Sequence, residues 1–253
     1  MKNRGFVIVA QNNSTTDYIK CAKVLAGSIK NFMPNEKVSL ITDVEYTDSI
    51  FDSVIIFPHG DTCPNNEWKL ANDWQVYDAS PYELTIKLEA DLYITRDIRW
   101  WWDRLESRDL FVCTTIRNYL NEISDSMYYR QFIVKNNLPN TYNAITYFKK
   151  SGTAKTFFSL VREIFEKWDE YKKILKCDPK EYSTTDFVYA IAARILGEEL
   201  CTDPALTDIS MIHMKKFIND TITDDWTNEL YYEISTDFTR INSSSQLYPL
   251  HYH

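Results

Sequence analysis

The residues best suited to chemistry lie in the segment 87–94, where Glu89 and Asp91 stand two positions apart in an otherwise mostly apolar run. On a strand, residues two apart point to the same face, and a buried strand does not carry two carboxylates unless something near its end needs negative charge. A divalent cation such as Mg²⁺ or Mn²⁺, bridging carboxylates and nucleotide phosphates, would meet that need. The alternative is a pair of surface residues at a strand end, paired with Lys87 or Arg96. Spacing alone does not decide between the two.

The elements around this segment follow the order of a mostly parallel sheet covered by helices, because short apolar runs alternate with helical patterns. Asp17 is predicted to cap the first helix, and Pro34 follows its end. No repeat or linker divides the chain, so we expect one α/β domain over residues 1–253. The predicted strands are 6–10, 38–42, 53–57 and 88–94, and the predicted helices are 18–32, 68–77, 154–168 and 185–196.

Composition excludes several common classes of site. The 5 glycines form neither a GxG nor a GxxxxGK arrangement, which rules out the usual dinucleotide fingerprint and the P-loop. The sequence also lacks HExxH, GxSxG and CxxC motifs. A net charge of −8 argues against a generic nucleic-acid coat but leaves room for a local basic groove.

Cysteine usage and hydropathy bear on location. The 5 cysteines are odd in number and widely scattered, which favours free thiols in a reducing compartment over a disulfide framework. No run approaches the roughly 20 apolar residues of a membrane span. We therefore expect a cytoplasmic protein with no membrane segment.

A bound nucleotide is expected to lie beyond the carboxyl ends of the strands. Gln11 and Asn12 follow the first strand and Asp43 follows the second, where a base would lie in a Rossmann-like sheet. Lys69 and Asn72, about one helical turn apart, are placed to meet phosphate or sugar. Two alternatives remain open: that Asn12 only forms the hydrogen bonds of a turn, and that Lys69 and Asn72 only lie on an exposed helix face.

Two further features have competing interpretations. His213 lies between apolar neighbours, as a buried structural histidine or a metal ligand would. The adjacent indoles Trp100, Trp101 and Trp102 cannot all face one core. We expect at least one of them to be partly exposed, either packing at a helix start or offering a stacking surface.

Several segments together resemble GT-A glycosyltransferases of the family 8-like type. The closest resemblance is to the small glycosyltransferase-like proteins of T4-like phages and cyanophages, in segments 5–12, 68–75 and 197–202, and it extends over nearly the whole chain. The motif matches are Glu89-Ala90-Asp91 with the DxD motif, Tyr142–Phe148 with an acceptor-side strand, Thr184-Thr185-Asp186 with a D-Q-D segment, and Ile212–Lys216 with a late histidine-lysine loop. Glu89 replaces the first Asp of DxD.

The resemblance implies a metal site and a phosphate contact. Asp91 and His213 would hold Mn²⁺ or Mg²⁺, with Glu89 in support. Lys215 or Lys216 would contact the diphosphate of a nucleotide sugar, most simply a UDP-sugar. A cation and a lysine would then neutralise the charge that develops on the leaving group.

The resemblance also implies an acceptor. Asn143 would lie on the acceptor side, and Asp186 would position or deprotonate the acceptor hydroxyl. The implied acceptor is a 5-hydroxymethylpyrimidine in duplex DNA. Alternatives are a protein or lipopolysaccharide acceptor, or a non-catalytic module that binds nucleotide sugars or DNA. The residues expected to contact DNA phosphates are Arg117, Arg130, Lys135, Lys149 and Lys150.

Overall fold

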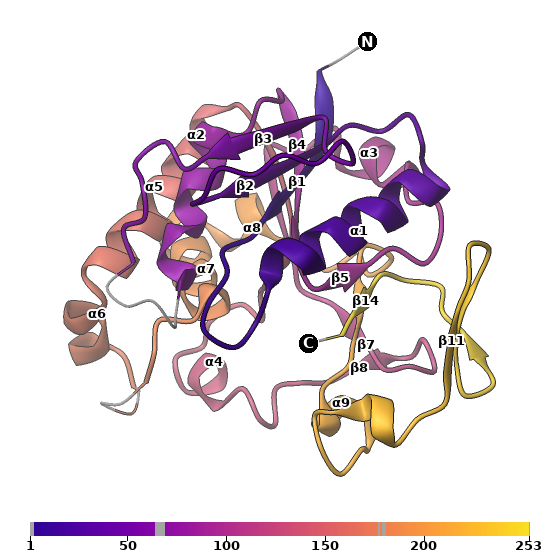
Figure 1. The fold of residues 1–253 in the computed structure, drawn as a ribbon. Helices are drawn as coiled ribbons and strands as arrows, with labels where there is room; N and C mark the ends of the chain where they lie inside the picture. Colours follow the sequence, from indigo (N-terminus) through magenta and orange to yellow (C-terminus); the bar gives the residue numbers. More distant parts are fainter. Residues whose placement is uncertain (1–2, 64–68, 177, 179–180, 253) are drawn as a thin grey trace.

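A computed structural model describes residues 3–63, 69–176, 178 and 181–252. Its central sheet contains β1 (Arg4–Val9), β2 (Val38–Thr42), β3 (Ser53–Ile56), β4 (Leu84–Glu89), β6 (Leu110–Cys113) and β9 (Tyr142–Lys149). The strand order is β3-β2-β1-β4-β9-β6 (Figure 1). Strands β3, β2, β1 and β4 are parallel to one another, whereas β9 is antiparallel to both β4 and β6. The carboxyl ends of β1, β2 and β4 therefore meet at one edge.

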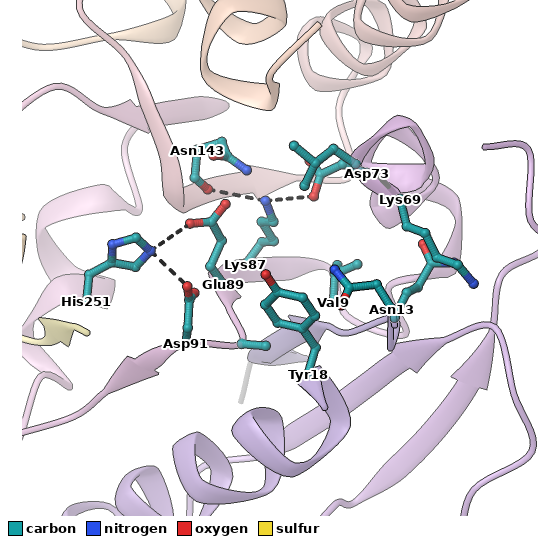
Figure 2. A pocket seen from close by; sticks show the side chains of 13 residues that line it. Val9, Asn13, Tyr18, Lys69, Asp73, Lys87, Glu89, Asp91, Asn143 and His251 are labelled. Carbon is teal, nitrogen blue, oxygen red and sulfur yellow. Dashed lines mark hydrogen bonds and ion pairs between the residues drawn. The ribbon is translucent and has the colours of Figure 1, made fainter. Parts of the chain in front are cut away.

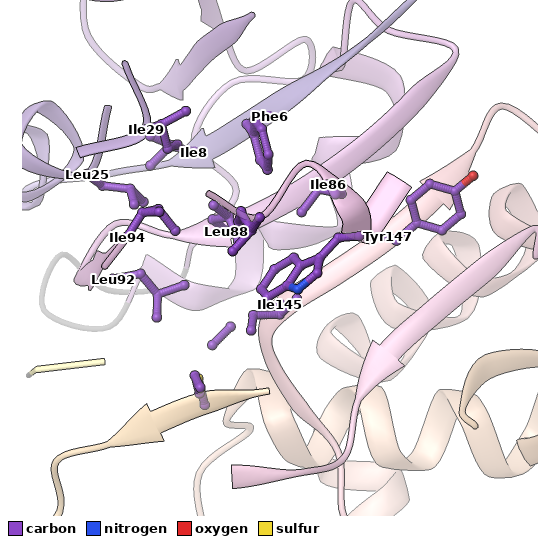
Figure 3. Packing of buried hydrophobic residues seen from close by; sticks show 14 of the residues in the cluster. Phe6, Ile8, Leu25, Ile29, Ile86, Leu88, Leu92, Ile94, Ile145 and Tyr147 are labelled. Carbon is purple, nitrogen blue, oxygen red and sulfur yellow. The ribbon is translucent and has the colours of Figure 1, made fainter. Parts of the chain in front are cut away.

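Helices cover both faces of this sheet because its strands are apolar on both sides. The helical elements are α1 (Tyr18–Phe32), η1 (Lys69–Gln75), α2 (Val76–Ala79), α3 (Trp100–Leu105), α4 (Gln131–Lys135), α5 (Gly152–Glu166), α6 (Trp168–Ile174), α7 (Thr185–Leu196), α8 (Glu198–Cys201), α9 (Lys216–Asn219) and η2 (Trp226–Asn228). Phe6 and Ile8 of β1 pack with Leu25 and Ile29 of α1 in one core (Figure 3). Val7, between them, points into the other core, which α5 and α7 cover.

A smaller sheet continues from the end of β4. It contains β5 (Leu92–Tyr93), β7 (Ile116–Arg117), β8 (Ile123–Ser124), β10 (Met211–His213) and β14 (Leu250–His251), in the order β5-β14-β10-β7-β8. Leu92 pairs with His251, and His213 pairs with the same residue from the other side. This sheet carries the last described residues of the chain back to the turn that contains Asp91.

A three-stranded antiparallel sheet lies beside the smaller sheet (Figure 1). It consists of β11 (Tyr232–Ile234), β12 (Thr239–Ile241) and β13 (Ser244–Ser245). Among the described residues, none of the helices combines the length and apolar character that a membrane crossing requires. The described cysteines are all free, as expected, and Cys177 lies outside the described residues.

The structure confirms the α/β class and most of the predicted elements. Asp17 caps α1, its carboxylate accepting a hydrogen bond from the Lys20 amide at 3.0 Å. Helix α7 has the predicted bounds, Thr185–Leu196. Trp100 is 37% exposed while its two indole neighbours are buried, as the crowding argument predicted.

Three predicted elements differ from the structure. The predicted strand 88–94 is divided into β4 and β5, because the chain turns at Ala90 and Asp91. The predicted helix 68–77 is a 3₁₀ turn followed by the short α2, and Trp68 lies outside the described residues. Helix α5 ends at Glu166, and Trp168 begins a separate helix.

Candidate functional site

A pocket of about 260 Å³ lies at the carboxyl edge of β1 and β4 (Figure 2). Charged and polar side chains from several elements converge on it, which is unusual because charged side chains are seldom buried in proteins. The residues that line it are Val9, Gln11, Asn13, Tyr18, Lys69, Leu70, Asp73, Lys87, Glu89, Ala90, Asp91, Asn143 and His251.

Two carboxylates and a histidine meet at one end of this pocket. Glu89 is the last residue of β4, Asp91 lies in the turn that follows, and His251 ends β14. The Nε2 atom of His251 lies 3.2 Å from Glu89 Oε2 and 3.3 Å from Asp91 Oδ1. One potential ligand atom from each residue lies within 4.8 Å of the others. Both carboxylates thus pair with a histidine, and Lys87 pairs with Asp73 instead.

His213 stands directly behind His251. Their Nδ1 atoms are 2.9 Å apart and their rings are stacked at 25°. Burial, and after it the charge of His251, holds the pKa of His213 well below its usual value. Burial also lowers the pKa of His251, but the negative charges of Asp91 and Glu89 beside it outweigh burial and raise it to about 10. A neutral His213 therefore accepts the Nδ1 proton of His251 and directs Nε2 toward the carboxylates.

The third member of the cluster is a residue that sequence reasoning missed. We expected His213 in that place, but its imidazole lies one ring further from the carboxylates, and His251 stands between. His251 stands outside every motif matched in the sequence. Its role becomes visible only from the pairing of β14 with β10, which sets His251 beside His213.

Gln11 and Asn72, both predicted to bind the donor, lie together. Asn72 is fully buried and donates to Gln11 Oε1 at 2.8 Å and to Asp61 Oδ1 at 2.7 Å. It also accepts hydrogen bonds from the amide and the hydroxyl of Thr62. Asn72 thus organises the pocket wall, whereas Gln11 lines the pocket. The Nε2 atom of Gln11 is buried and finds no partner among the described residues.

Lys69 lies at the opposite end of the pocket from His251, held by two carboxylates. Its Nζ atom is 2.6 Å from Asp43 Oδ2 and 3.2 Å from Asp61 Oδ2. The hydrogen bond that Lys69 donates to Asp43 raises the pKa of Lys69 and outweighs its partial burial. Asp43 therefore fixes the position of the lysine, and the lysine is the member of the pair that lines the pocket.

The asparagines after β1 have different positions. The side chain of Asn12 accepts a hydrogen bond from the Ile19 amide at 2.9 Å and so fixes the start of α1. Asn12 therefore has the local turn role that was the alternative to binding a base. Asn13, its neighbour, is the asparagine that lines the pocket.

A second pocket of about 240 Å³ adjoins the first and shares Leu70, Glu89, Asn143 and His251 with it. Asp186, His213 and Lys215 lie among its remaining lining residues. Lys216 does not line either pocket. Its side chain lies over the ring of Phe217, with Nζ 4.8 Å from the ring centroid.

Asp186 uses both carboxylate oxygens within the protein. Oδ1 accepts a hydrogen bond from the Asn143 amide at 2.9 Å, and Oδ2 pairs with Arg130 at 2.9 Å. Arg130 is buried and also donates to the carbonyl of Thr141. Asn143 is thereby held at the border of the two pockets, 5% exposed.

A buried charge network forms the floor of the first pocket. Lys87 of β4 is fully buried, and its Nζ atom lies 2.7 Å from Asp73 Oδ1 and 3.3 Å from the Asn143 carbonyl oxygen. Asp73 accepts a further hydrogen bond from the buried Tyr189 hydroxyl. Sequence reasoning missed this network, because its members come from four separate elements.

Comparison with known proteins bears on the fold. No protein-family model and no curated protein sequence matches the chain. The galactosyltransferase LgtC, in complex with donor and acceptor sugar analogs, is similar with a TM-score of 0.56 and 11% identity over 84% of this chain and 77% of that chain. An active-site mutant of LgtC gives a TM-score of 0.59 at 12% identity, over 98% and 86% of the two chains. The chain has the GT-A glycosyltransferase fold.

A further similar structure has a longer chain. The glycosyltransferase GlyE of Streptococcus pneumoniae TIGR4 gives a TM-score of 0.50 at 10% identity over 81% of this chain. This chain spans only 45% of the GlyE chain.

The GT-A topology corrects one expectation about the basic residues. Strand β9 is antiparallel to β4, so Lys149 pairs with Leu84 at the far end of β4 from Glu89. Five residues of strand at about 3.4 Å each separate the two ends by roughly 17 Å. Lys149 and Lys150 therefore lie at the sheet edge opposite to the pockets, and the prediction that they flank the acceptor is wrong.

The cluster at the end of β4 fits a divalent cation of the Mn²⁺ or Mg²⁺ type. Cis ligands of an octahedral ion bound at about 2.1 Å lie about 3 Å apart, close to the 3.2 and 3.3 Å found here. His251 Nε2 is buried and has no hydrogen bond of good geometry among the described residues. A bound cation would take the place of its proton.

Proposed function

We propose that this chain is a metal-dependent glycosyltransferase that transfers a sugar from a nucleotide sugar, most simply a UDP-sugar, to a hydroxyl group. The observation that carries the proposal is the cluster of Glu89, Asp91 and His251 inside a pocket at the carboxyl edge of a GT-A sheet. A surface role for the two carboxylates would not need a buried histidine directed at both of them. We treat residues 1–253 as one such domain and keep the expectation of a cytoplasmic location.

Glu89, Asp91 and His251 are the residues that would hold Mn²⁺ or Mg²⁺. The cation, when bound, neutralises charge on the diphosphate leaving group. His213 acts on this site through His251, since a hydrogen bond at Nδ1 fixes the tautomer and the ring orientation of the ligand. Asp91 is 8% exposed, so its carboxylate is largely shielded from solvent.

The chain's own cations flank the path of the diphosphate. We assign Lys69, at one end of the donor pocket, and Lys215, which lines the adjoining second pocket, to the diphosphate. Gln11 is assigned to the base, because its buried Nε2 donor is matched to a carbonyl such as those of uracil. Lys216, Asn12, Asp43 and Asn72 are assigned to the supporting structure.

The second pocket is proposed to take the acceptor. Asn143 lies at its border with the donor pocket, and Asp186 positions Asn143 through the backbone amide. Because both Asp186 oxygens are engaged, we assign it positioning rather than deprotonation of the hydroxyl. The sequence resemblance favours hydroxymethylated duplex DNA as acceptor. The acceptor sugar analog bound by LgtC favours a saccharide as the second candidate.

A transfer assay with both acceptor classes tests the proposal. The protein is incubated with Mn²⁺ and a panel of UDP-, GDP- and ADP-sugars, against hydroxymethylated DNA, unmodified DNA and oligosaccharides, with mass analysis of nucleosides and glycans. We expect transfer from one donor that Asp91→Asn abolishes. Transfer to a saccharide alone would replace the DNA acceptor and keep the glycosyltransferase. Full transfer in EDTA would overturn the metal-dependent mechanism.

A further inference from the structure

The Lys87–Asp73 pair is buried in a place where the fold alone does not require it. The neighbours of Lys87 along β4, Ile86 and Leu88, belong to the apolar core beneath α1. Lys87 points the other way, toward the pocket, and shares its face of the strand with Glu89. Figure 2 shows its ammonium group between Asp73 and Asn143, beside Glu89.

Burial of such a pair is costly unless its remaining hydrogen-bonding capacity is used. Lys87 has three N–H donors, and the described residues accept two of them, at Asp73 and at the Asn143 carbonyl. The Asp73 carboxylate has about four acceptor positions, of which Lys87 and the Tyr189 hydroxyl occupy two. Both residues line the donor pocket, and the Lys87 ammonium also lies over the Tyr189 ring, with Nζ 5.6 Å from the ring centroid.

The chemistry of the pair selects the part of a ligand that it suits. A carboxylate next to the pocket repels a diphosphate, whereas a hydroxyl group can donate to the carboxylate and accept from the ammonium at once. The pair also touches Asn143, which borders the second pocket. Lys87 therefore lies beside both Glu89 of the cation cluster and Asn143, where the group to be transferred would lie.

We propose that Lys87 and Asp73 form the sugar subsite of the donor pocket and bind hydroxyl groups of the transferred sugar. This inference rests on the proposed function. Asp73 accepts a hydrogen bond from one sugar hydroxyl, and Lys87 donates to the same or the neighbouring hydroxyl. Tyr189 acts as a positioning residue that holds Asp73 from behind.

The test compares a nucleotide sugar with its nucleotide, because only the former carries the sugar. Affinities for UDP, UDP-glucose and UDP-galactose, with the matching GDP compounds, are measured by calorimetry in Mn²⁺. A lost hydrogen bond to a charged group costs about 10- to 100-fold in affinity. Asp73→Asn is expected to weaken binding of the preferred nucleotide sugar by about that factor and to change binding of the free nucleotide less than about twofold.

Two further variants keep the test decisive. Replacing both partners, Lys87→Met with Asp73→Leu, removes the subsite without leaving a buried charge, so the protein should still fold. Asp52→Asn is the matched control, because Asp52 also forms an ion pair of 2.7 Å, with Lys30. Asp52 precedes β3 and so lies at the amino ends of the strands, away from the pockets. The control should leave the ratio of the two affinities unchanged.

Each result is decisive. Selective loss of nucleotide-sugar affinity in Asp73→Asn and in the double variant supports the subsite. Equal loss for nucleotide and nucleotide sugar, or no loss, overturns it and leaves the proposed function intact. A wild-type protein that binds no nucleotide sugar overturns the proposed function and the subsite together, and this outcome is recognised before any variant is made.

Discussion

His213 and His251, 38 residues apart in the chain, face each other with their Nδ1 atoms 2.9 Å apart. Two facing nitrogens at this distance share one proton, so one ring donates and the other accepts. Because only His251 also faces Glu89 and Asp91, the two histidines are not equivalent. The outer ring is a candidate ligand, and the inner ring sets its orientation.

This relationship predicts a graded effect on metal affinity. His251→Ala removes a proposed ligand and should abolish measurable Mn²⁺ binding at the site. His213→Ala removes the hydrogen-bond partner of a ligand, which typically costs about 10- to 100-fold in metal affinity. Titration of free Mn²⁺ by electron paramagnetic resonance measures both.

His59, which lies at the surface with a partly exposed pairing to Asp78, provides the matched control. His59→Ala should bind Mn²⁺ as the wild type does. A loss in His213→Ala that equals or exceeds the loss in His251→Ala would restore His213 as the direct ligand.

Charge reversal at two places distinguishes the edges of the sheet. Lys215→Glu should weaken binding of the preferred nucleotide sugar by at least about tenfold, because it places a carboxylate beside the proposed diphosphate path. Lys149→Glu with Lys150→Glu should leave that affinity and transfer to any acceptor unchanged at ~0.15 M salt, where the screening length is about 8 Å. Steady-state transfer and calorimetry report the two effects. Weaker acceptor binding in the double variant would contradict the placement of these lysines.

The fold was largely predictable from sequence, for physical reasons. Apolar runs such as 38–42 are buried on both faces and read directly as central strands. Asp17 and Thr184 each supply a cap to the helix that follows them, which fixes the starts of α1 and α7. These signals are local, so no knowledge of distant contacts is needed.

The site was only partly predictable, because its geometry depends on distant contacts. Glu89 and Asp91 stand out as charges in an apolar run. Lys87 and Asp73 are charged as well, but their pairing can be predicted only when β4 and η1 are known to lie side by side. His251 becomes visible only when β14 pairs with β5 and β10.

Asn72 is predicted to contribute to stability through its hydrogen bonds. Asn72→Leu leaves polar groups of Gln11, Asp61 and Thr62 without their partner, and each buried unsatisfied group costs about 1–3 kcal/mol. We expect the free energy of unfolding to fall by about 2 kcal/mol or more in urea titrations. Asn31→Ala, at an exposed position of α1, should lower it by less than about 1 kcal/mol. Equal effects in the two variants would contradict this assignment.

Two glycines form a matched pair for packing. A Cβ atom at Gly5 would lie 2.4 Å from the ring of Tyr82, whose hydroxyl is fixed by Ser39. Gly5→Ala should therefore destabilise the protein by about 1–3 kcal/mol. Gly27 in α1 has open space around the same position, so Gly27→Ala should stabilise by about 0.5–1 kcal/mol. Thermal unfolding of both variants checks the sign, and a stabilising Gly5→Ala would contradict the packing.

The most direct test of the account is calorimetric binding of nucleotide sugars to the wild type and to Asp91→Asn, each in Mn²⁺ and in EDTA. We expect one nucleotide sugar to bind the wild type in Mn²⁺, and EDTA to weaken this binding by at least about tenfold. Asp91→Asn, with the same unfolding temperature as the wild type, should bind that nucleotide sugar in Mn²⁺ only as well as the wild type does in EDTA. Binding of equal strength in all four experiments, or no binding of any nucleotide sugar to the wild type, would contradict it.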